Sequence, residues 1–315
     1  MANLLRRRAP SSEARSRVRA KLSSSRGREA AAGFLFIAPA YILYFLFMLL
    51  PILIATYLSL NTYDLMHPMR FAGIQNYREV FADPRVWISY ANTFVFTFSV
   101  VIGITVFGLI VAMLVNREFS RITNYVFRLA FFLPFIIPYA FIAIVWSQFF
   151  NTDAGIINYY LSQVGLHGIG WLSDPHYALL SVILMDIWKN IGFTMVVILA
   201  GLQSVPKEFR EAATVDGASY FQVFFRIILP MISPVIFFCF VFITIGAMKV
   251  FDAIWILTKG GPGDSSRSIV VFIYDTAFTS YRYGYGSAVA ITLLIVIMIL
   301  TLLQFRVANK WVYRA

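Results

Sequence analysis

Six long apolar segments constrain the fold of this chain more than any other feature. They cover residues 31–60, 92–115, 126–150, 178–202, 231–249 (with an apolar continuation to 257) and 287–305. A helix of about 20 apolar residues is long enough to cross the roughly 30 Å hydrocarbon core of a bilayer. The expected fold class is therefore all-α: a polytopic membrane protein with six transmembrane helices.

The composition supports a membrane protein. Hydrophobic residues make up 60% of the chain and charged residues only 13%, whereas soluble domains are roughly 45–50% apolar and about 25% charged. The first apolar segment, 31–60, is much longer than the about 7–15 residues of a signal-peptide core, and no clear cleavage site follows it. We interpret it as a retained helix. The single cysteine, Cys239, excludes an intramolecular disulfide.

The distribution of basic residues predicts the orientation in the membrane. Nine of the 26 Lys and Arg residues lie in residues 1–30, and this basic tail next to an apolar segment indicates a membrane surface more than a nucleic acid. With the N-terminus inside, the cytoplasmic segments carry 18 basic residues and the external loops carry 6. Because basic residues are preferentially retained in the cytoplasm, both termini are expected there.

Two lysines fall in or beside the apolar segments, and each has an acid three positions away. The pairs are Asp186 with Lys189, and Lys249 with Asp252. Residues three apart share a helix face, so each pair is expected to neutralise itself locally. Ionisable groups at membrane depth also mark solute paths. For the pair at 186 and 189, both a structural role and a solute path remain open; for the pair at 249 and 252, near the external end, we favour a structural role.

Prolines interrupt several of the apolar segments and should kink or end their helices. They are Pro39, Pro51, Pro134, Pro138, Pro230 and Pro234. Such kinks are tolerated where neighbouring helices or cavities satisfy the freed carbonyls. Aromatic and amide side chains near the kinks could bind a sugar by stacking and hydrogen bonding, although simple packing is the alternative for each. These candidates are Tyr139, Trp146, Trp188 and Asn190.

The loop over residues 204–234, between the fourth and fifth apolar segments, contains the signals of a short helix. Ser204 can cap its start, and Pro206 suits its opening turn. Glu208 and Glu211 are favourable near the positive end of the helix dipole.

A second short helix is expected beyond Gly217, which is well placed to end the first one. Ser219 and Gln222 form an S-x-x-Q capping box, and the second helix must end or bend near Pro230. Small residues make the first helix slender at three positions: Ala212, Ala213 and Ala218. Taken alone, this pattern is also typical of an amphipathic connector on the membrane surface.

The same loop contains a longer motif, which consists of Glu211-Ala212-Ala213, Asp216-Gly217-Ala218, Phe224, Ile227, Leu229-Pro230 and Pro234. This motif resembles the EAA loop of binding-protein-dependent ABC importer permeases. Further matches occur at 38–40, 51, 73–77, 92–93, 155–158, 257–263, 274–278 and 283–288. Those at 257–263, 274–278 and 283–288 resemble the carbohydrate-uptake branch, and within it the maltose- and glycerol-phosphate-type first permease. One departure is Lys259, where Gly is common before the Gly-Gly-Pro turn.

The resemblance implies a type I importer permease in the cell membrane. The implied partners are a second, similar permease, two ATP-binding subunits and an external solute-binding protein. ATP and Mg²⁺ would be bound by the ATPase, and this chain would bind no cofactor. The implied organisation is a basic cytoplasmic tail (1–30), a first transmembrane helix with an external loop (31–90), a permease core (91–306) and a C-terminal tail (307–315). Coupling to the ATPase would depend on Glu208, Glu211, Ala212, Ala213, Asp216, Gly217 and Ala218.

No motif indicates an enzyme. The chain lacks a G-x-x-x-x-G-K-[ST] phosphate loop, and His67, His167 and His176 show no zinc-site spacing. Two alternatives remain: a secondary transporter, which would require an internal repeat, and an intramembrane enzyme that uses Asp186 with Asn190. We see no clear repeat and no second catalytic group, and both alternatives leave the motif at 211–234 unexplained.

Overall fold

A computed structural model describes residues 32–64, 66–117 and 120–312, so the predicted tail at 1–30 lies outside the described residues. The chain divides into two units, residues 1–57 and 58–315. The described part of the first unit is an apolar helix that begins at Ala32 and continues through η1 (Phe45–Leu49) into α2 (Leu50–Ser59). The π-helical turn η1 ends two residues before Pro51. Because proline has no N–H to donate to the preceding turn, a local change in hydrogen bonding is expected there.

Most of the regular secondary structure of the second unit is helical. Its helices are α3 (Gln75–Ala82), α4 (Pro84–Val115), α5 (Arg121–Ile136), α6 (Tyr139–Phe149), α7 (Ile156–Gln163), α8 (Ala178–Ser204), α9 (Lys207–Val215), α10 (Tyr220–Val223), η2 (Phe224–Ile228), α11 (Leu229–Met231), α12 (Ser233–Ala247), α13 (Asp252–Leu257), α14 (Ile269–Tyr274), η3 (Asp275–Thr279) and α15 (Tyr283–Ala308). Strands β1 (Asn61–Thr62) and β2 (Arg70–Phe71) form a small antiparallel ribbon in which Asn61 lies opposite Phe71.

The described residues contain four helices long and apolar enough to cross a membrane, or up to six if each of two bent pairs is one span. One bent pair falls in the predicted third span, and the other joins residues 220–231 of the predicted 204–234 loop to the predicted fifth span. The third span, predicted over 126–150 with Pro134 and Pro138 expected to kink or end its helix, is broken into α5 and α6, which lie at 99° to each other. The fifth bends by 64° between residues 231 and 233. The predicted starts of the second and sixth spans were too late, because α4 begins at Pro84 and α15 at Tyr283.

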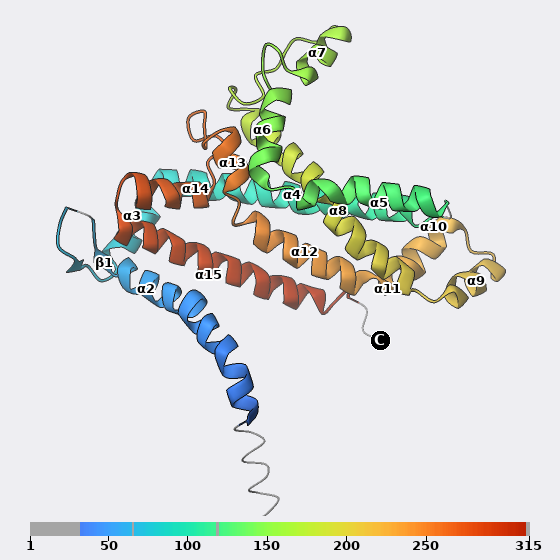
Figure 1. The fold of residues 1–315 in the computed structure, drawn as a ribbon, viewed down its shortest axis with the longest axis horizontal. Helices are drawn as coiled ribbons and strands as arrows, with labels where there is room; N and C mark the ends of the chain where they lie inside the picture. The colour runs from blue at the N-terminus through green and yellow to red at the C-terminus, as the bar shows by residue number, and fades with distance from the viewer. Residues whose placement is uncertain (1–31, 65, 118–119, 313–315) are drawn as a thin grey trace, which may run out of the picture. The chain divides into compact units, whose positions relative to one another are not determined.

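Pro138 explains the break in the third span. It has no N–H to donate to the Pro134 carbonyl, and it disfavours helical backbone at the preceding residue. Ile137 is accordingly extended, with φ −69° and ψ 132°. The chain therefore leaves the direction of α5 at this point and continues as α6, which packs against α13, and as α7, which projects away from the other helices of this unit (Figure 1).

The core of the second unit forms where α4 crosses α8. A Cβ atom at Gly108 would overlap the Thr194 side chain, and one at Gly192 would overlap the backbone of Phe131 in α5. These glycines therefore allow α8 to lie close to both neighbouring helices. Figure 1 shows α9 at one end of α4, while α13 and α14 lie toward the other. At about 1.5 Å per residue, the 32 residues of α4 separate those two ends by about 48 Å.

Candidate functional site: helix α9, a polar cavity and the loop between α13 and α14

Helix α9 starts differently from the expectation. Ser204 does not cap it: this serine is the last residue of α8, and its hydroxyl donates back to the Gly201 carbonyl (2.8 Å). The N-cap position of α9 is Pro206, which has no side-chain capping bond, and Glu208 lies in the first turn as predicted. The predicted serine cap was wrong because α8 extends two residues beyond the expected end of its apolar segment.

The end of α9 confirms the predicted role of Gly217. The Gly217 N–H donates to the Thr214 carbonyl (3.1 Å), and the Ala218 N–H donates to the Ala213 carbonyl (2.9 Å). This pair of bonds is a Schellman motif, which requires a left-handed residue after the C-cap. Gly217 has φ +78°. The capping box of the next helix is also confirmed: the Ser219 N–H donates to the Gln222 side chain (2.7 Å).

Most of the predicted coupling residues on α9 are exposed. Glu208, Glu211 and Ala212 are exposed, whereas Ala213 is buried. Asp216 and Gly217 are exposed and Ala218 is half-buried. Sequence reasoning missed two apolar side chains on the same helix: Phe209 is 53% exposed and Val215 is 88% exposed. Both side chains are therefore accessible on the surface of α9, together with Glu208 and Glu211.

Arg210 attaches α9 to the end of α8. Its guanidinium donates to the Leu202 carbonyl (3.4 Å), which belongs to the last turn of α8. A cation at this position is favourable because the helix dipole places partial negative charge at the C-terminus. After α10, the chain passes through η2 and then bends at Ile232. The loop that contains the predicted coupling residues is therefore continuous with the bent fifth span.

A cavity of about 230 Å³ lies between α4, α8, α12 and the segment that joins α12 to α13. Three of the predicted path residues line it, and they share hydrogen bonds. The Tyr139 hydroxyl donates to an Asp186 carboxylate oxygen (2.8 Å). The Asn190 amide donates to the Tyr139 hydroxyl (2.9 Å) and to the Asp186 carbonyl (2.8 Å). These groups orient a buried carboxylate at the wall of the cavity.

Lys189 does not pair with Asp186, so the predicted local ion pair was wrong. The Lys189 ammonium instead donates to the carbonyls of Pro134 (3.2 Å) and Phe135 (3.0 Å), at the end of α5. It also lies 4.4 Å from the centre of the Tyr139 ring. The break at residues 137–138 leaves the Pro134 carbonyl without its helical donor, and a buried lysine supplies the missing hydrogen bond. Lys189 thus stabilises the bend of the third span.

Lys249 and Asp252 form no ion pair in the described part of the chain, which contradicts the second predicted pair. Helix α12 ends at Ala247 and α13 begins at Asp252, so the two residues do not share a helix face. Both are exposed, and both line the cavity. The local ion pair that we expected for them was therefore wrong, and both residues belong instead to the wall of the cavity.

Aromatic residues from three helices form part of the cavity wall. The Phe193 ring stacks on Phe135 (5.0 Å between centroids) and contacts Phe242 (4.9 Å). Trp146 and Trp188, predicted as path candidates, lie 5.5 Å apart and are not among the lining residues. The signal that could have indicated Phe193 is its position three residues after Asn190, on the same face of α8.

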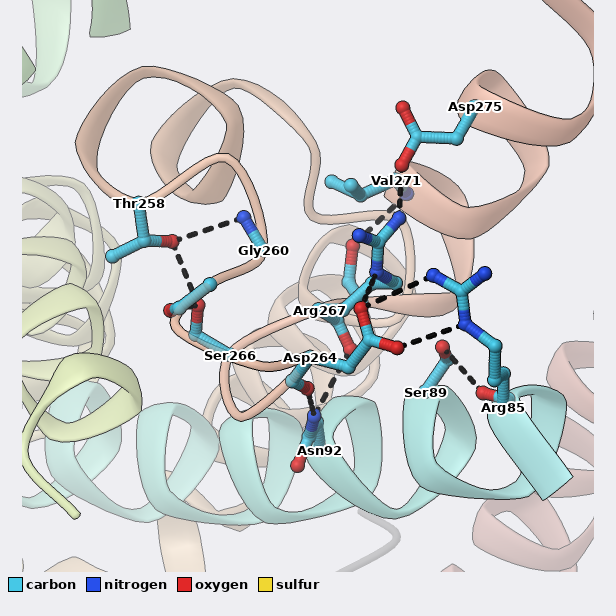
Figure 2. A network of polar contacts seen from close by, with 12 residues as sticks. Arg85, Ser89, Asn92, Thr258, Gly260, Asp264, Ser266, Arg267, Val271 and Asp275 are labelled. Carbon is cyan, nitrogen blue, oxygen red and sulfur yellow. Dashed lines mark hydrogen bonds and ion pairs between the residues drawn. The ribbon is translucent and has the colours of Figure 1, made fainter. Parts of the chain in front are cut away.

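Figure 2 shows a polar network between the loop after α13 and the other end of α4. The Asp264 carboxylate accepts hydrogen bonds from Arg85 (2.9 Å) and Arg267 (2.5 Å), and Arg267 also pairs with Asp275. The Asn92 amide donates to the backbone carbonyls of Asp264 (2.8 Å) and Arg267 (3.2 Å). Burial acts to raise the pKa of Asp264, but the two arginines outweigh it and keep the pKa below its ordinary value. This network joins the start of α4 to the segment before α15.

The predicted loop histidines lie outside these arrangements. His67 and His176 are exposed and lie 3.0 Å from Asp64 and Asp174, respectively. His167 is also exposed.

The described chain combines apolar helices able to span a membrane, a cavity between them and an exposed helix continuous with one bent span. Together these features define a multi-pass membrane transport protein. Residues 104–313 match the family described as the binding-protein-dependent transport system inner membrane component. The chain belongs to this family, and it is a transport subunit embedded in a membrane.

Similarity to individual proteins supports the same assignment. The chain is 35% identical over 254 residues to a sulfoquinovosyl glycerol transport system permease of Agrobacterium fabrum, covering 79% of this chain and 82% of that protein. It is 34% identical over 258 residues to a trehalose/maltose transport system permease of Thermococcus litoralis, covering 82% and 85%. A bacterial alginate ABC transporter, solved with an alginate-bound periplasmic protein, has the same fold: the TM-score is 0.79 at 23% identity, covering 90% of this chain and 96% of that one.

Proposed function

We propose that this chain is one permease subunit of an ATP-driven importer in the cell membrane, and that it translocates a sugar or sugar-like solute. An external solute-binding protein would deliver the solute, and a second, similar permease would complete the path. Two separate ATP-binding subunits would hydrolyse ATP with Mg²⁺, so this chain would itself be no enzyme and bind no cofactor. The relatives named for sulfoquinovosyl glycerol and for trehalose and maltose support the class of solute.

The observation that carries the coupling role is the exposed surface of α9. Its charged and apolar side chains, among them Glu211 and Val215, are exposed, while Ala213 and the bond from Arg210 hold the helix to the membrane-spanning core. A cleft in an ATPase could enclose this surface. Because α9 is continuous with the bent fifth span, closure of the ATPases would then move the spans that line the cavity.

The cavity suits a polyhydroxylated solute. Asp186, Asn190 and Tyr139 can exchange hydrogen bonds with hydroxyl groups, and the Phe193 and Phe242 rings offer apolar faces for a sugar ring. Binding at such a site shifts the inward-open and outward-open states only by the solute's differential affinity for them. Net accumulation therefore requires ATP hydrolysis by the partner subunits.

The test uses the whole complex, purified with its membrane partners and reconstituted in liposomes. Gly217→Leu should uncouple hydrolysis from transport: uptake of labelled saccharide should fall about tenfold or more while ATP hydrolysis continues. Gly165→Leu is the matched control, since Gly165 has φ +79° and, like Gly217, open space where a Cβ would lie. Both variants carry the same backbone strain, but only Gly217 belongs to the coupling loop. Normal uptake in the Gly217 variant would contradict the coupling role.

A further inference from the structure

Two helices near the network of Figure 2 end in left-handed residues that are not glycine. Lys259 (φ 52°) follows the C-cap of α13, and Tyr281 (φ 56°) follows the C-cap of η3. Among the described residues, only one further non-glycine residue, Asp264 (φ 66°), has a positive φ. This conformation is unfavourable for residues with a Cβ, and glycine is the usual residue after a helix C-cap.

Helix termination alone does not explain these side chains. The chain ends α9 in the same conformation with Gly217, at φ +78° and without this strain. Asp264 has an internal role, because its carboxylate accepts hydrogen bonds from Arg85 and Arg267. Lys259 is exposed and Tyr281 is 50% exposed. Within the described residues, neither side chain has a hydrogen bond, an ion pair or a ring contact.

The segments that carry the two residues are held rigidly and are linked to each other. The Thr258 and Ser266 hydroxyls share a hydrogen bond (2.7 Å), and Ser266 donates to the Gly261 carbonyl (2.6 Å). The pair between Arg267 and Asp275 joins this loop to η3, which Tyr281 follows (Figure 2). Two strained residues are thus presented from one rigid base. Binding to such a base requires little additional ordering.

We propose that Lys259 and Tyr281 are binding determinants for the external solute-binding protein. Lys259 would pair with a carboxylate on that protein, and Tyr281 would enter an apolar depression on its surface. An exposed cation steers an acidic partner, and tyrosine is among the side chains that contribute most to protein interfaces. This inference depends on the proposed function, which supplies the partner, and on the orientation that places this end of α4 outside.

A protein partner accounts for the strain better than a lipid does. Lysine and tyrosine also contact lipid headgroups at membrane surfaces, but they do so with flexible side chains on ordinary backbone. A headgroup therefore gives no reason for a left-handed lysine and a left-handed tyrosine on a braced loop. A partner that binds in one orientation requires defined positions for both side chains.

The experiment uses the complex in nanodiscs and the solute-loaded binding protein that stimulates ATP hydrolysis by the wild type. The rate of ATP hydrolysis is measured as the concentration of this binding protein is increased. Lys259→Gly and Tyr281→Gly should each raise the half-maximal concentration about tenfold, with basal hydrolysis unchanged. For Lys259→Gly the dependence of this concentration on salt should also weaken. Thermal midpoints should not fall, because glycine relieves the strain. Arg70→Gly, which removes an exposed cation from the same predicted side, is the control and should leave the half-maximal concentration unchanged.

Three results would overturn the inference. The first is a half-maximal concentration that stays at the wild-type value in both glycine variants. The second is an equal loss in the Arg70 control, which would indicate a general charge effect. The third is a loss that appears only in nanodiscs with anionic lipids, which would assign the residues to lipid contact. If no binding protein stimulates the wild type at all, the proposed function itself fails, and these variants play no part in that result.

Discussion

Replacing Lys189 with Met tests the assignment of this lysine to the bend in the third span. Lys189 is 3% exposed, and its ammonium donates to the carbonyls of Pro134 and Phe135. Methionine has a similar length and volume but cannot donate a hydrogen bond. The variant therefore leaves two carbonyls at the end of α5 without this donor and removes the positive charge nearest to Asp186.

The expected destabilisation follows from those losses. A buried polar group left without its partner costs about 1–3 kcal/mol. Removing the desolvated ammonium recovers part of this lost stability, because burial of a charge is itself unfavourable. The net expectation for Lys189→Met is a loss of about 2–4 kcal/mol in the free energy of unfolding. At roughly 2–4 °C per kcal/mol, the thermal midpoint should fall by about 5 °C or more.

Thermal unfolding of the complex in nanodiscs, followed by intrinsic fluorescence, measures this loss. The control is Lys249→Met, which removes an exposed lysine without an ion pair in the described chain and should change stability by less than about 0.5 kcal/mol. Adding Asp186→Asn to Lys189→Met should cost less than the sum of the two single changes, because it removes the uncompensated carboxylate. A wild-type midpoint for Lys189→Met, or an equal loss in the Lys249 control, would refute the assignment.

Two further predictions concern packing and pH. Gly192→Ala should destabilise the fold by about 1–3 kcal/mol in the same thermal assay, because its Cβ would overlap the Phe131 backbone, whereas Gly246→Ala has open space and should lose less than about 0.5 kcal/mol. Asp264→Asn should lower stability at pH 7, where the carboxylate is bound by two arginines. The folded-state pKa of Asp264 lies below the ordinary value of about 3.9, so the ionised carboxylate contributes its full stabilisation above that pH. This stabilisation disappears as the pH falls through the folded-state pKa. The midpoints of wild type and Asp264→Asn should therefore converge below about pH 4, and a constant difference down to pH 2 would contradict the pairing.

Local features of the chain were predicted well from sequence. Residues near each other in sequence determine how helices start and stop, and the structure confirmed Gly217 as the end of α9 and the Ser219–Gln222 capping box. The length of each apolar segment located the spans, because this signal also lies within a short stretch of sequence. The predicted N-cap at Ser204 was wrong because it required α8 to end before Ser204. How far α8 continues is decided by its packing against neighbouring helices.

The candidate site depended on contacts between distant segments. The sequence placed Asp186 and Lys189 on one helix face, but only the fold brought the end of α5 near enough to compete for the lysine. Lys249 and Asp252 joined the cavity because the chain breaks between α12 and α13. The aromatic wall around Phe193 likewise combines residues from three helices.

The sequence alone thus determined the class of protein, the approximate position of the spans, the end of α9 at Gly217 and the capping box that starts α10. These depend on apolar length, charge distribution and local backbone chemistry. Tertiary structure decided the partner of each buried charge, the lining of the cavity and the link between Asp264 and Asp275. A buried charge binds whichever donors or acceptors the packed helices bring within hydrogen-bonding distance, and positions separated by more than 170 residues, such as Arg85 and Asp264, meet only after folding.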